Sequence, residues 1–468
     1  MTPRTAAPFR FVDLFAGVGG FHAALSALGG QCVYAVEKDP LAAAVYNRNW
    51  KPQRSSLGDI VDDTEGRMRV PKHDVLAAGF PCQPFSKSGY QRGMDEARGT
   101  LFWNICEVLR VRRPSVVLLE NVRNIAGPRH EHEWDVIVRS LRDLGYRVSS
   151  KPVVFSPHLL PPERGGRPQV RERVFILGTY TGRRAARSDI DPTVPHVPVD
   201  GWAPEEWSLH RDLPTQPDDE LAEPLRLNLS PEETTWVDAW DDFVATLWRA
   251  GVDRLPGFPV WKDAFVHESD LVIDPGTPAW KAAFLRKNSV FYTQHQEVLE
   301  SWLERWDYLN DFPVSRRKFE WQAQDAPSLD ETVMHLRPSG LRAKKPTYVP
   351  ALVAITQTSI LGDRRRRISP REAARLQGLP EWFDFGSQPR SATYKQLGNG
   401  VNVGAAYHVL REHVRANLAW VTSRSPGLAR AAGESADSPD PAVERHWDEH
   451  RPVMSRARHP ADVARRAG

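Results

Sequence analysis

Cysteine is scarce in this chain, and its scarcity excludes several classes of protein. Only three cysteines occur among 468 residues, and no two of them form a Cys-x-x-Cys pair. An odd number of cysteines without such a pair argues against a disulfide framework and against a structural zinc site. We therefore expect reduced thiols and no metal.

Long apolar runs are absent as well. No run is long enough to span a bilayer, and residues 1–10 lack the apolar core of a signal peptide. We expect a cytoplasmic protein without membrane contact. Because 41% of the residues are hydrophobic, the chain can bury a sizeable core, and its length predicts two or more domains.

Charge of one sign is not in excess either. The formal net charge is +3, so bulk charge does not by itself indicate a nucleic-acid partner. Basic residues do cluster locally, at 110–113, at 364–367, and at Arg342, Lys344 and Lys345. Such clusters can build a basic groove on a near-neutral protein, although each one taken singly fits a solvated surface better.

The first part of the chain alternates strand and helix patterns, which predicts a doubly wound α/β domain. The expected strands are 9–14, 31–36, 74–78, 115–119, 148–155 and 173–179, and the expected helices are 20–28, 39–49, 101–111 and 133–144. A capping box at Ser369 opens a further helix, and 401–420 is expected to form a closing helix.

Composition divides the remainder. Proline, tryptophan and aspartate dominate from 183 onward and the alternation disappears, so 183–365 is predicted to be a second, smaller domain inserted into the first, with helices at 236–248 and 296–306. The first domain then comprises 1–182 and 366–421. Residues 422–468 contain few apolar side chains and are expected to be disordered.

One thiol is placed as a nucleophile would be. Cys82 lies in Gly79-Phe-Pro-Cys-Gln-Pro-Phe-Ser-Lys-Ser-Gly89, directly after an apolar strand, whereas Cys32 and Cys106 have apolar surroundings typical of buried cysteine. From this peptide alone, a surface thiol in a turn is the alternative.

The glycine turn after the first strand predicts a ligand site. Asp13-Leu-Phe-Ala-Gly-Val-Gly-Gly-Phe21 follows a strand and opens a helix, and Glu37 ends the next strand, where it can bind ribose hydroxyls. Nicotinamide dinucleotide binding is the commonest use of such a turn. His22 stands where that fingerprint needs its third glycine, which favours an adenosine-type ligand without a pyrophosphate.

Charged groups are expected at the same edge of the sheet. Glu120 ends the fourth strand, and Arg171 and Arg173 are spaced to share one face of a later strand. Singly they could be surface residues. Together with Cys82 they supply an acid, a nucleophile and a cationic clamp.

The ordered motifs resemble those of DNA (cytosine-5) methyltransferases of the bacterial restriction-modification type. The matching blocks are 13–21, Glu37, 59–60, 79–86, 99–102, 120–122, 169–173, 371–378 and 396–400. They cover roughly 8–180 and 365–420 and leave out the tryptophan-rich middle, where this family carries its target-recognition domain.

The resemblance implies a mechanism and a cofactor. The Cys82 thiolate would add to carbon 6 of a cytosine flipped out of double-stranded DNA, Glu120 would act at N3, Arg173 would hold the base carbonyl, and Arg171 would belong to the same clamp or the catalytic loop. S-adenosylmethionine would be held by Asp13, Phe15, Ala16, Gly17, Gly19, Gly20, Glu37, Asp59, Ile60, Pro81, Leu101, Asn399 and Gly400. Lys38 departs from the family, which usually has an apolar residue there, as does Gly400, where serine is usual.

The same resemblance implies contacts with DNA and leaves two alternatives. Gln83, Ser86, Lys87, Ser88 and Arg92 would belong to the loop that closes over the flipped base, and Arg342, Lys344 and Lys345 would contact DNA from the inserted domain. A monomer is expected, with room for a cognate restriction endonuclease that acts separately.

An RNA cytosine-5 methyltransferase and a catalytically silent DNA-binding homologue are the rivals. The larger RNA family tends to have a second cysteine where this chain has Glu120, and a silent homologue should have lost Cys82, Glu120 or Arg173. Both comparisons favour an active DNA enzyme.

Overall fold

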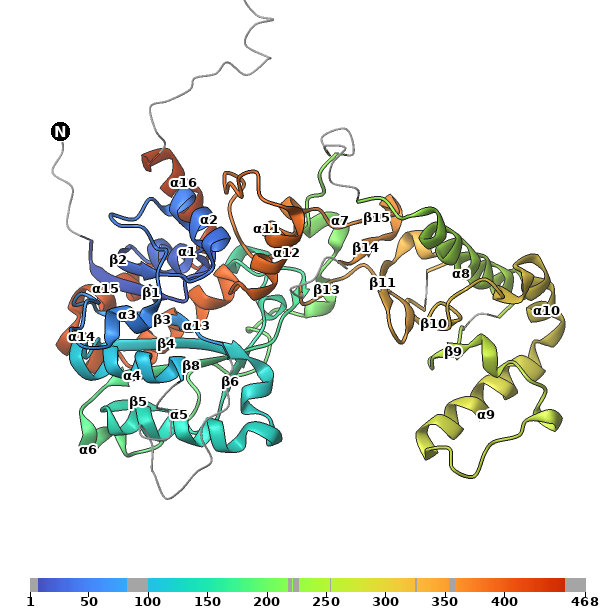
Figure 1. Cartoon of the computed structure of the whole chain (residues 1–468), viewed down its shortest axis with the longest axis horizontal. Coiled ribbons are helices and arrows are strands. Elements are labelled where there is room, and N and C mark those ends of the chain that lie inside the picture. The colour runs from blue at the N-terminus through green and yellow to red at the C-terminus, as the bar shows by residue number, and fades with distance from the viewer. Residues whose placement is uncertain are drawn as a thin grey trace, which may run out of the picture. The chain divides into compact units, whose positions relative to one another are not determined.

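The chain folds into two compact units, whose helices and strands are labelled in Figure 1. The computed structural model describes residues 7–81, 100–217, 221, 227–252, 254–324, 326–352 and 358–450, without the side chains of 446–450. The first unit comprises Met1–Arg167, Arg171–Pro204 and Ala374–Gly468, and the second comprises Pro168–Val170 and Glu205–Ala373. The insertion predicted at 183–365 therefore starts later and ends later in the structure, because residues 183–204 fold with the first unit.

A seven-stranded sheet forms the centre of the first unit, in the order β2-β1-β3-β4-β8-β5, with β6 also paired to β8. Its strands are β1 (Phe9–Leu14), β2 (Gly30–Val36), β3 (Val75–Gly79), β4 (Val116–Val122), β5 (Tyr146–Val148), β6 (Val153–Phe155) and β8 (Arg173–Tyr180). The first four strands are mutually parallel, and β8 runs antiparallel to β4. This order confirms the doubly wound α/β class.

Helices lie on both sides of this sheet (Figure 1). One side is covered by α3 (Ile60–Thr64), α4 (Leu101–Arg112) and α5 (Glu131–Asp143), whose apolar side chains share a core with the strands. The other helices of the unit are α1 (Gly20–Ala27), α2 (Pro40–Trp50), α6 (Arg183–Ala186), α12 (Arg390–Asn399), α13 (Val403–Ala416), α14 (Leu418–Arg424), α15 (Pro426–Glu434) and α16 (Asp440–His450). A further helix, α11 (Pro370–Leu376), begins in the second unit.

Two expected elements are broken in the structure. The strand expected at 148–155 is two strands, because Pro152 has no N–H to donate to a neighbouring strand. The helix expected at 401–420 divides into α13 and α14 at Asn417, whose side chain donates to the carbonyl of His413 at 2.9 Å. Helix α3 was not expected.

The disorder expected from residue 422 does not hold for 422–450. Those residues form the end of α14, all of α15 and α16, and they bury Leu428, Ala432 and Val443. The ring hydroxyl of Tyr407 donates to the carbonyl of Ala436 at 2.6 Å. A few apolar residues are enough to fold this segment, because they pack against helices α13 and α1 of the first unit. Residues 451–468 lie outside the described part of the chain.

The second unit is built on a six-stranded sheet in the order β15-β14-β11-β12-β10-β9. Its strands are β9 (Val260–Trp261), β10 (Lys318–Gln322), β11 (Val333–Arg337), β12 (Gly340–Lys344), β14 (Ile360–Leu361) and β15 (Arg366–Arg367), beside a separate pair β7 (Gln169–Val170) and β13 (Val349–Pro350). Its helices are α7 (Leu209–Asp212), α8 (Pro231–Arg249), α9 (Ala279–Gln294) and α10 (Gln296–Arg305).

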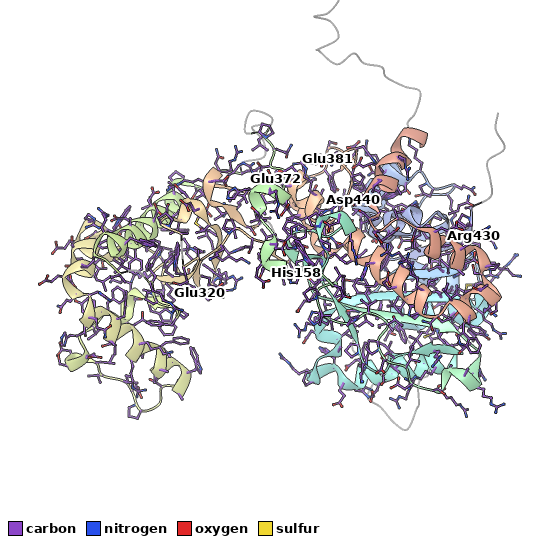
Figure 2. The ribbon with its side chains drawn as sticks, turned by 180° about the vertical axis from the view of Figure 1, so that it is seen from behind. His158, Glu320, Glu372, Glu381, Arg430 and Asp440 are labelled. Carbon is purple, nitrogen blue, oxygen red and sulfur yellow. The ribbon has the colours of Figure 1, made fainter. Side chains whose placement is uncertain are left out.

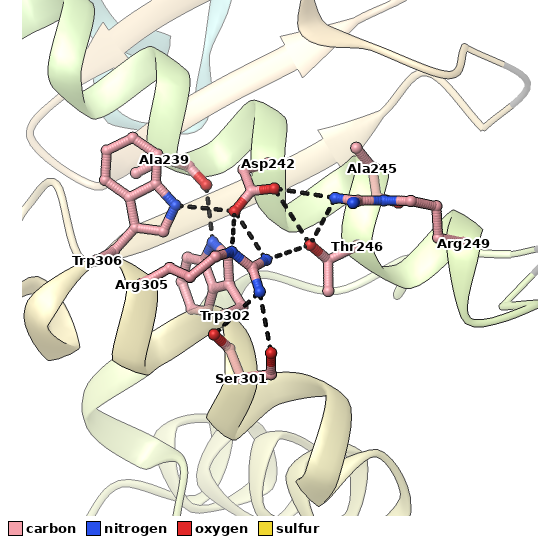
Figure 3. A network of polar contacts seen from close by, with 9 residues as sticks. All are labelled: Ala239, Asp242, Ala245, Thr246, Arg249, Ser301, Trp302, Arg305 and Trp306. Carbon is pink, nitrogen blue, oxygen red and sulfur yellow. Dashed lines mark hydrogen bonds and ion pairs between the residues drawn. The ribbon is translucent and has the colours of Figure 1, made fainter.

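Tryptophan and a carboxylate hold the helices of this unit together (Figure 3). Trp240 and Trp302 are fully buried, with ring centroids 5.3 Å apart. Asp242 on α8 pairs with Arg305 on α10 at 2.8 Å and accepts from the indole of Trp306 at 3.0 Å. Much of the tryptophan enrichment noted in the sequence therefore serves the core of this unit.

Candidate active site

A cavity of about 480 Å³ opens in the first unit at the carboxyl ends of β1, β2, β3 and β4. Ligands bind along this edge in open α/β sheets, and the volume lies within the range of small-molecule sites. The predicted cofactor residues that line it are Phe15, Ala16, Gly17, Gly20, Glu37, Pro81, Leu101, Asn399 and Gly400. The structure therefore brings together residues that are nearly 400 positions apart in the chain.

The glycine turn takes its shape from left-handed backbone and from one carboxylate. Phe15 has a φ of 56° and Gly19 a φ of 94°. Glu37 accepts from the backbone N–H of Gly17 at 2.8 Å and from that of Asp39 at 2.7 Å. Each oxygen of Glu37 therefore has one backbone partner and keeps acceptor capacity for hydroxyl groups of a ligand.

Gly20 allows the turn to pack closely against residue 401. A Cβ at this position would lie 2.5 Å from the backbone oxygen of Val401. Phe21 and Phe80, which belong to the matching motifs but were not among the expected cofactor residues, complete the wall of the cavity beside Phe15 and Leu101. An adenosine-type ligand with hydroxyl, amino and carboxylate groups fits this combination of apolar wall, exposed backbone and carboxylates.

Glu120 and Arg173 form a buried ion pair at the inner end of the cavity. The distance from Arg173 Nε to Glu120 Oε1 is 3.0 Å, and both side chains are largely buried. Burial raises the pKa of the Glu120 carboxyl, while Arg173 and Arg171 oppose that rise. Gly79 lies beside it, since a Cβ there would be 3.4 Å from Glu120 Oε2. The pair holds the carboxyl group in one orientation.

Arg171 does not line the cavity, although it was expected to belong to the clamp with Arg173 or to the catalytic loop. Its guanidinium is 1% exposed and donates from Nη2 to the carbonyls of Gly398, at 2.8 Å, and Gly400, at 2.5 Å. Its backbone N–H donates to Ser156 Oγ at 2.8 Å. Burial, and then the charge of Arg173, lower the pKa of Arg171 to about 9. Its Nη2 thus contacts the backbone of two residues that line the cavity.

Four predicted cofactor residues do not line the cavity. Asp13 is fully buried in β1, and burial raises the pKa of its carboxyl well above the usual range. Gly19 packs its Cα against the indole of Trp50. Asp59 caps α3 and pairs with the Lys38 ammonium at 2.7 Å, and Ile60 is buried in the core. Lys38, where the family usually has an apolar residue, thus forms an ion pair with Asp59, one of the residues expected to bind the cofactor.

The expected nucleophile lies just beyond the described part of the site. Pro81, its neighbour in the chain, lines the cavity. Cys82, Gln83, Ser86, Lys87, Ser88 and Arg92 all lie outside the described residues. The two remaining cysteines are unsuited to nucleophilic attack, because burial raises the pKa of Cys106, and burial with the charge of Asp13 raises that of Cys32 to about 12.

Comparisons with known proteins agree with this geometry. The sequence model of the family described as C-5 cytosine-specific DNA methylase matches residues 9–415. The chain belongs to this family. It is 47% identical over 511 aligned residues to the Type II methyltransferase M.AluI of Cellulosimicrobium cellulans, covering 93% of this chain and 98% of that protein.

Two further proteins show lower similarity to this chain. The chain is 41% identical to the Type II methyltransferase M.HhaI of Haemophilus parahaemolyticus over 36% of this chain and 48% of that protein. It is also similar to the crystal structure of a DNMT2 variant from Spodoptera frugiperda, at 16% identity and a TM-score of 0.43, covering 86% of this chain and 99% of that one.

Three of the basic residues expected to contact DNA, Arg342, Lys344 and Lys345, lie in the second unit of this C-5 cytosine-specific DNA methylase. Arg342 and Lys344 belong to β12, and Lys345 follows it. Arg342 pairs with Glu320 at 2.6 Å, and the Lys344 ammonium lies 3.9 Å from the ring centroid of Tyr348. The sequence motifs gave no sign of Glu320 as a partner, because it lies on β10 and meets Arg342 only through the pairing of β10 with β12.

Neither a membrane segment nor a metal cluster is found in the part of the chain that the structure describes. No helix there has both the length and the apolar character needed to cross a bilayer. No group of three or more histidine, cysteine or carboxylate side chains there is arranged to hold a metal ion.

Proposed function

We propose that the protein transfers a methyl group from S-adenosylmethionine to carbon 5 of one cytosine within a specific sequence of double-stranded DNA, as a DNA (cytosine-5-)-methyltransferase does. The observation that carries this proposal is the buried Glu120–Arg173 pair at a cavity that Pro81, the residue before Cys82, also lines. A carboxyl with a raised pKa beside a thiol-bearing loop is what activation of a pyrimidine requires.

In the proposed mechanism, the Cys82 thiolate forms a bond to carbon 6 of the cytosine, and the ring electrons move toward carbon 5 and N3. Glu120 keeps its proton to a higher pH than an exposed glutamate does, and it shares that proton with N3 as negative charge develops there. Arg173 holds Glu120 and faces the base carbonyl. Carbon 5 then takes the methyl group, its proton leaves to a base, and the bond from carbon 6 to sulfur breaks.

The cofactor would lie along the glycine turn. Glu37 would accept hydrogen bonds from the ribose hydroxyls, Phe15 would pack against the adenine, and the backbone from Gly17 to Gly20 would meet the methionine portion. When bound, S-adenosylmethionine supplies the methyl group on a sulfonium that leaves as a neutral thioether. Asn399 and Gly400 would close the pocket, held in place by Arg171.

We further propose that the second unit recognises the target sequence and that the target cytosine is rotated out of the duplex, at a free-energy cost of about a few kcal/mol. The loop from Gln83 to Arg92 would close over the flipped base. The name of the 47% identical relative supports a place in a type II restriction-modification system. The protein would then act as a cytoplasmic monomer, with a cognate endonuclease acting separately.

The test is methyl transfer from labelled S-adenosylmethionine to mixed genomic DNA, followed by bisulfite sequencing of the product. Wild type should place methylcytosine within one short motif, and Cys82→Ala should lose transfer while still binding the cofactor. Cys32→Ser is the matched control, because it removes a half-buried thiol on β2 and should leave transfer intact. Transfer by Cys82→Ala at the wild-type rate, or transfer by wild type to RNA alone, would overturn the proposal.

A further inference from the structure

The sheet of the second unit has one apolar face and one charged face. Along β10, β11 and β12, the alternate residues Phe319, Trp321, Met334, Leu336, Leu341 and Ala343 are buried in the core of the unit. The residues between them point to the opposite face. They include Glu320, His335, Arg337, Arg342 and Lys344, all of them half-buried, beside the fully buried Val333. We call this opposite face, defined by these five residues, the charged face.

Cations predominate on the charged face, and each one makes the protonated form of its neighbours less favourable. Burial, followed by the charges of Arg342 and Arg337, lowers the pKa of Lys344 to about 8. Burial and the same three cations keep His335 neutral, with a pKa of about 3. Like charges held together on a sheet oppose folding, so the arrangement indicates a polyanionic partner that compensates them.

Arg342 lies at the centre of this face with a fixed orientation. In the strand register it stands opposite His335 on one side and Glu320 on the other. Its Nε donates to Glu320 Oε2 at 2.7 Å, and its Nη2 lies 2.6 Å from the same oxygen. Glu320, labelled in Figure 2, thus holds the guanidinium by its inner edge. Both side chains keep about a quarter of their surface exposed, 27% for Arg342 and 25% for Glu320.

The outer end of this guanidinium has the geometry of a base reader. A guanidinium has five N–H donors, and the Glu320 oxygen faces two of them, so the pair of parallel N–H groups on Nη1 and Nη2 remains at the outer end. In the major groove, guanine presents N7 and O6 as two adjacent acceptors, which a guanidinium binds with two parallel hydrogen bonds. An arginine fixed by a carboxylate does not need to lose rotamer freedom when it binds.

We infer that Arg342, oriented by Glu320, recognises a guanine of the target sequence in the major groove, and that Arg337 and Lys344 on either side contact phosphates. This inference rests on the proposed function, and it names the specificity-determining residue of that function. The phosphate contacts supply attraction that does not depend on sequence, whereas the Arg342 contact distinguishes one base pair from the others.

The test uses Arg342→Lys, which keeps the positive charge but lacks the planar pair of donors. Arg305→Lys is its matched control, because Arg305 also pairs with a carboxylate of the same unit, Asp242, but belongs to helix α10 and not to the charged face (Figure 3). Thermal unfolding and cofactor affinity are measured for every variant. Glu320→Gln, which keeps the shape of the side chain but removes its charge, serves as a second probe if Arg342→Lys fails to fold.

The substrates are duplexes carrying the motif that wild type methylates, with each guanine replaced in turn by 7-deazaguanine, which lacks the N7 acceptor. At one guanine this replacement should lower kcat/KM of wild type and of Arg305→Lys by about 5- to 150-fold. Arg342→Lys should show a similar loss on the unmodified duplex and no further loss with the analogue. Glu320→Gln should show a smaller response to the analogue than wild type does.

Two outcomes would overturn the inference. In one, no guanine replacement affects wild type; in the other, the analogue lowers kcat/KM of Arg342→Lys by as much as it does for wild type. Failure of the proposed function looks different, since wild type that binds cofactor would then transfer no methyl group to any duplex.

Discussion

Replacing Arg171 by alanine should separate positioning of the cofactor pocket from catalysis at the base. Two hydrogen bonds from its Nη2 reach the carbonyls of Gly398 and Gly400, and the side chain is 1% exposed. Each buried carbonyl left without a donor costs about 1–3 kcal/mol, so the two together cost about 2–6 kcal/mol. Because both residues line the cavity, we expect part of this loss in cofactor affinity, about tenfold or more.

The charge of Arg171 adds a second, independent signature. Arg171 opposes the rise in the pKa of Glu120, so its removal should move the pH dependence of kcat/KM to higher pH. Arg171→Lys should retain the wild-type pH dependence while losing part of the cofactor affinity. A lysine ammonium keeps the positive charge but lacks the planar set of N–H donors of a guanidinium.

Isothermal titration with S-adenosylmethionine and a pH–rate profile measure the two effects. Arg167→Ala is the control, because Arg167 lies in the same segment and pairs with Asp440 and the carbonyl of Arg375, away from the cavity. It should lower the unfolding temperature without changing cofactor affinity. The reasoning is refuted if Arg171→Ala binds the cofactor as tightly as wild type and shows the same pH profile.

Three further variants test single contacts. Glu120→Gln should lower kcat/KM by about 10²- to 10⁴-fold and remove the decline that wild type shows as pH rises through the raised pKa of Glu120; an unchanged profile would exclude Glu120 as the acid. Gly20→Ala should weaken cofactor binding, because its Cβ would meet Val401 O at 2.5 Å, whereas Gly433→Ala, with open space around it, should not. Burial lowers the pKa of His413 to about 4 in the folded protein. As pH falls below about 6.5, the His413 imidazole is therefore protonated in the unfolded chain before it is protonated in the folded one. Stability should drop by up to about 3 kcal/mol toward pH 4, and denaturant titrations should show a smaller drop for His413→Gln.

The first unit could be predicted largely from sequence because its signals are local. Apolar runs of five to seven residues end at glycine or a carboxylate, and β1 begins and ends where its pattern indicates. The motif residues at the strand ends therefore fall at one edge, which is where the structure has the cavity. A parallel sheet brings those ends together without any information from side-chain contacts.

The remaining features depend on contacts between distant segments. Arg171 was expected in the base clamp or the catalytic loop, but its partners lie 227 and 229 positions further along the chain, and no local pattern indicates that contact. The helices after residue 422 have too few apolar side chains to predict a fold, yet α15 docks on α13 and α16 docks on α1. In the second unit, strands as short as two residues pair out of chain order, so alternation along the chain could not reveal the sheet.

The charges around the cavity explain why so costly an arrangement suits the proposed chemistry. Burial raises the pKa of Glu120 and lowers that of Arg171, so it favours the neutral form of each group. Arg173 pairs with the Glu120 carboxyl, and the charge of Arg171 also acts on it, while Arg171 itself donates to the carbonyls of Gly398 and Gly400. A buried set of this kind is stable only when its members are paired. Once Glu120 holds a proton, the Arg173 charge has no full counter-charge, and negative charge that develops on a pyrimidine ring in the cavity would supply it. The free energy that burial costs in the folded protein is thus recovered in the transition state, where the site needs it.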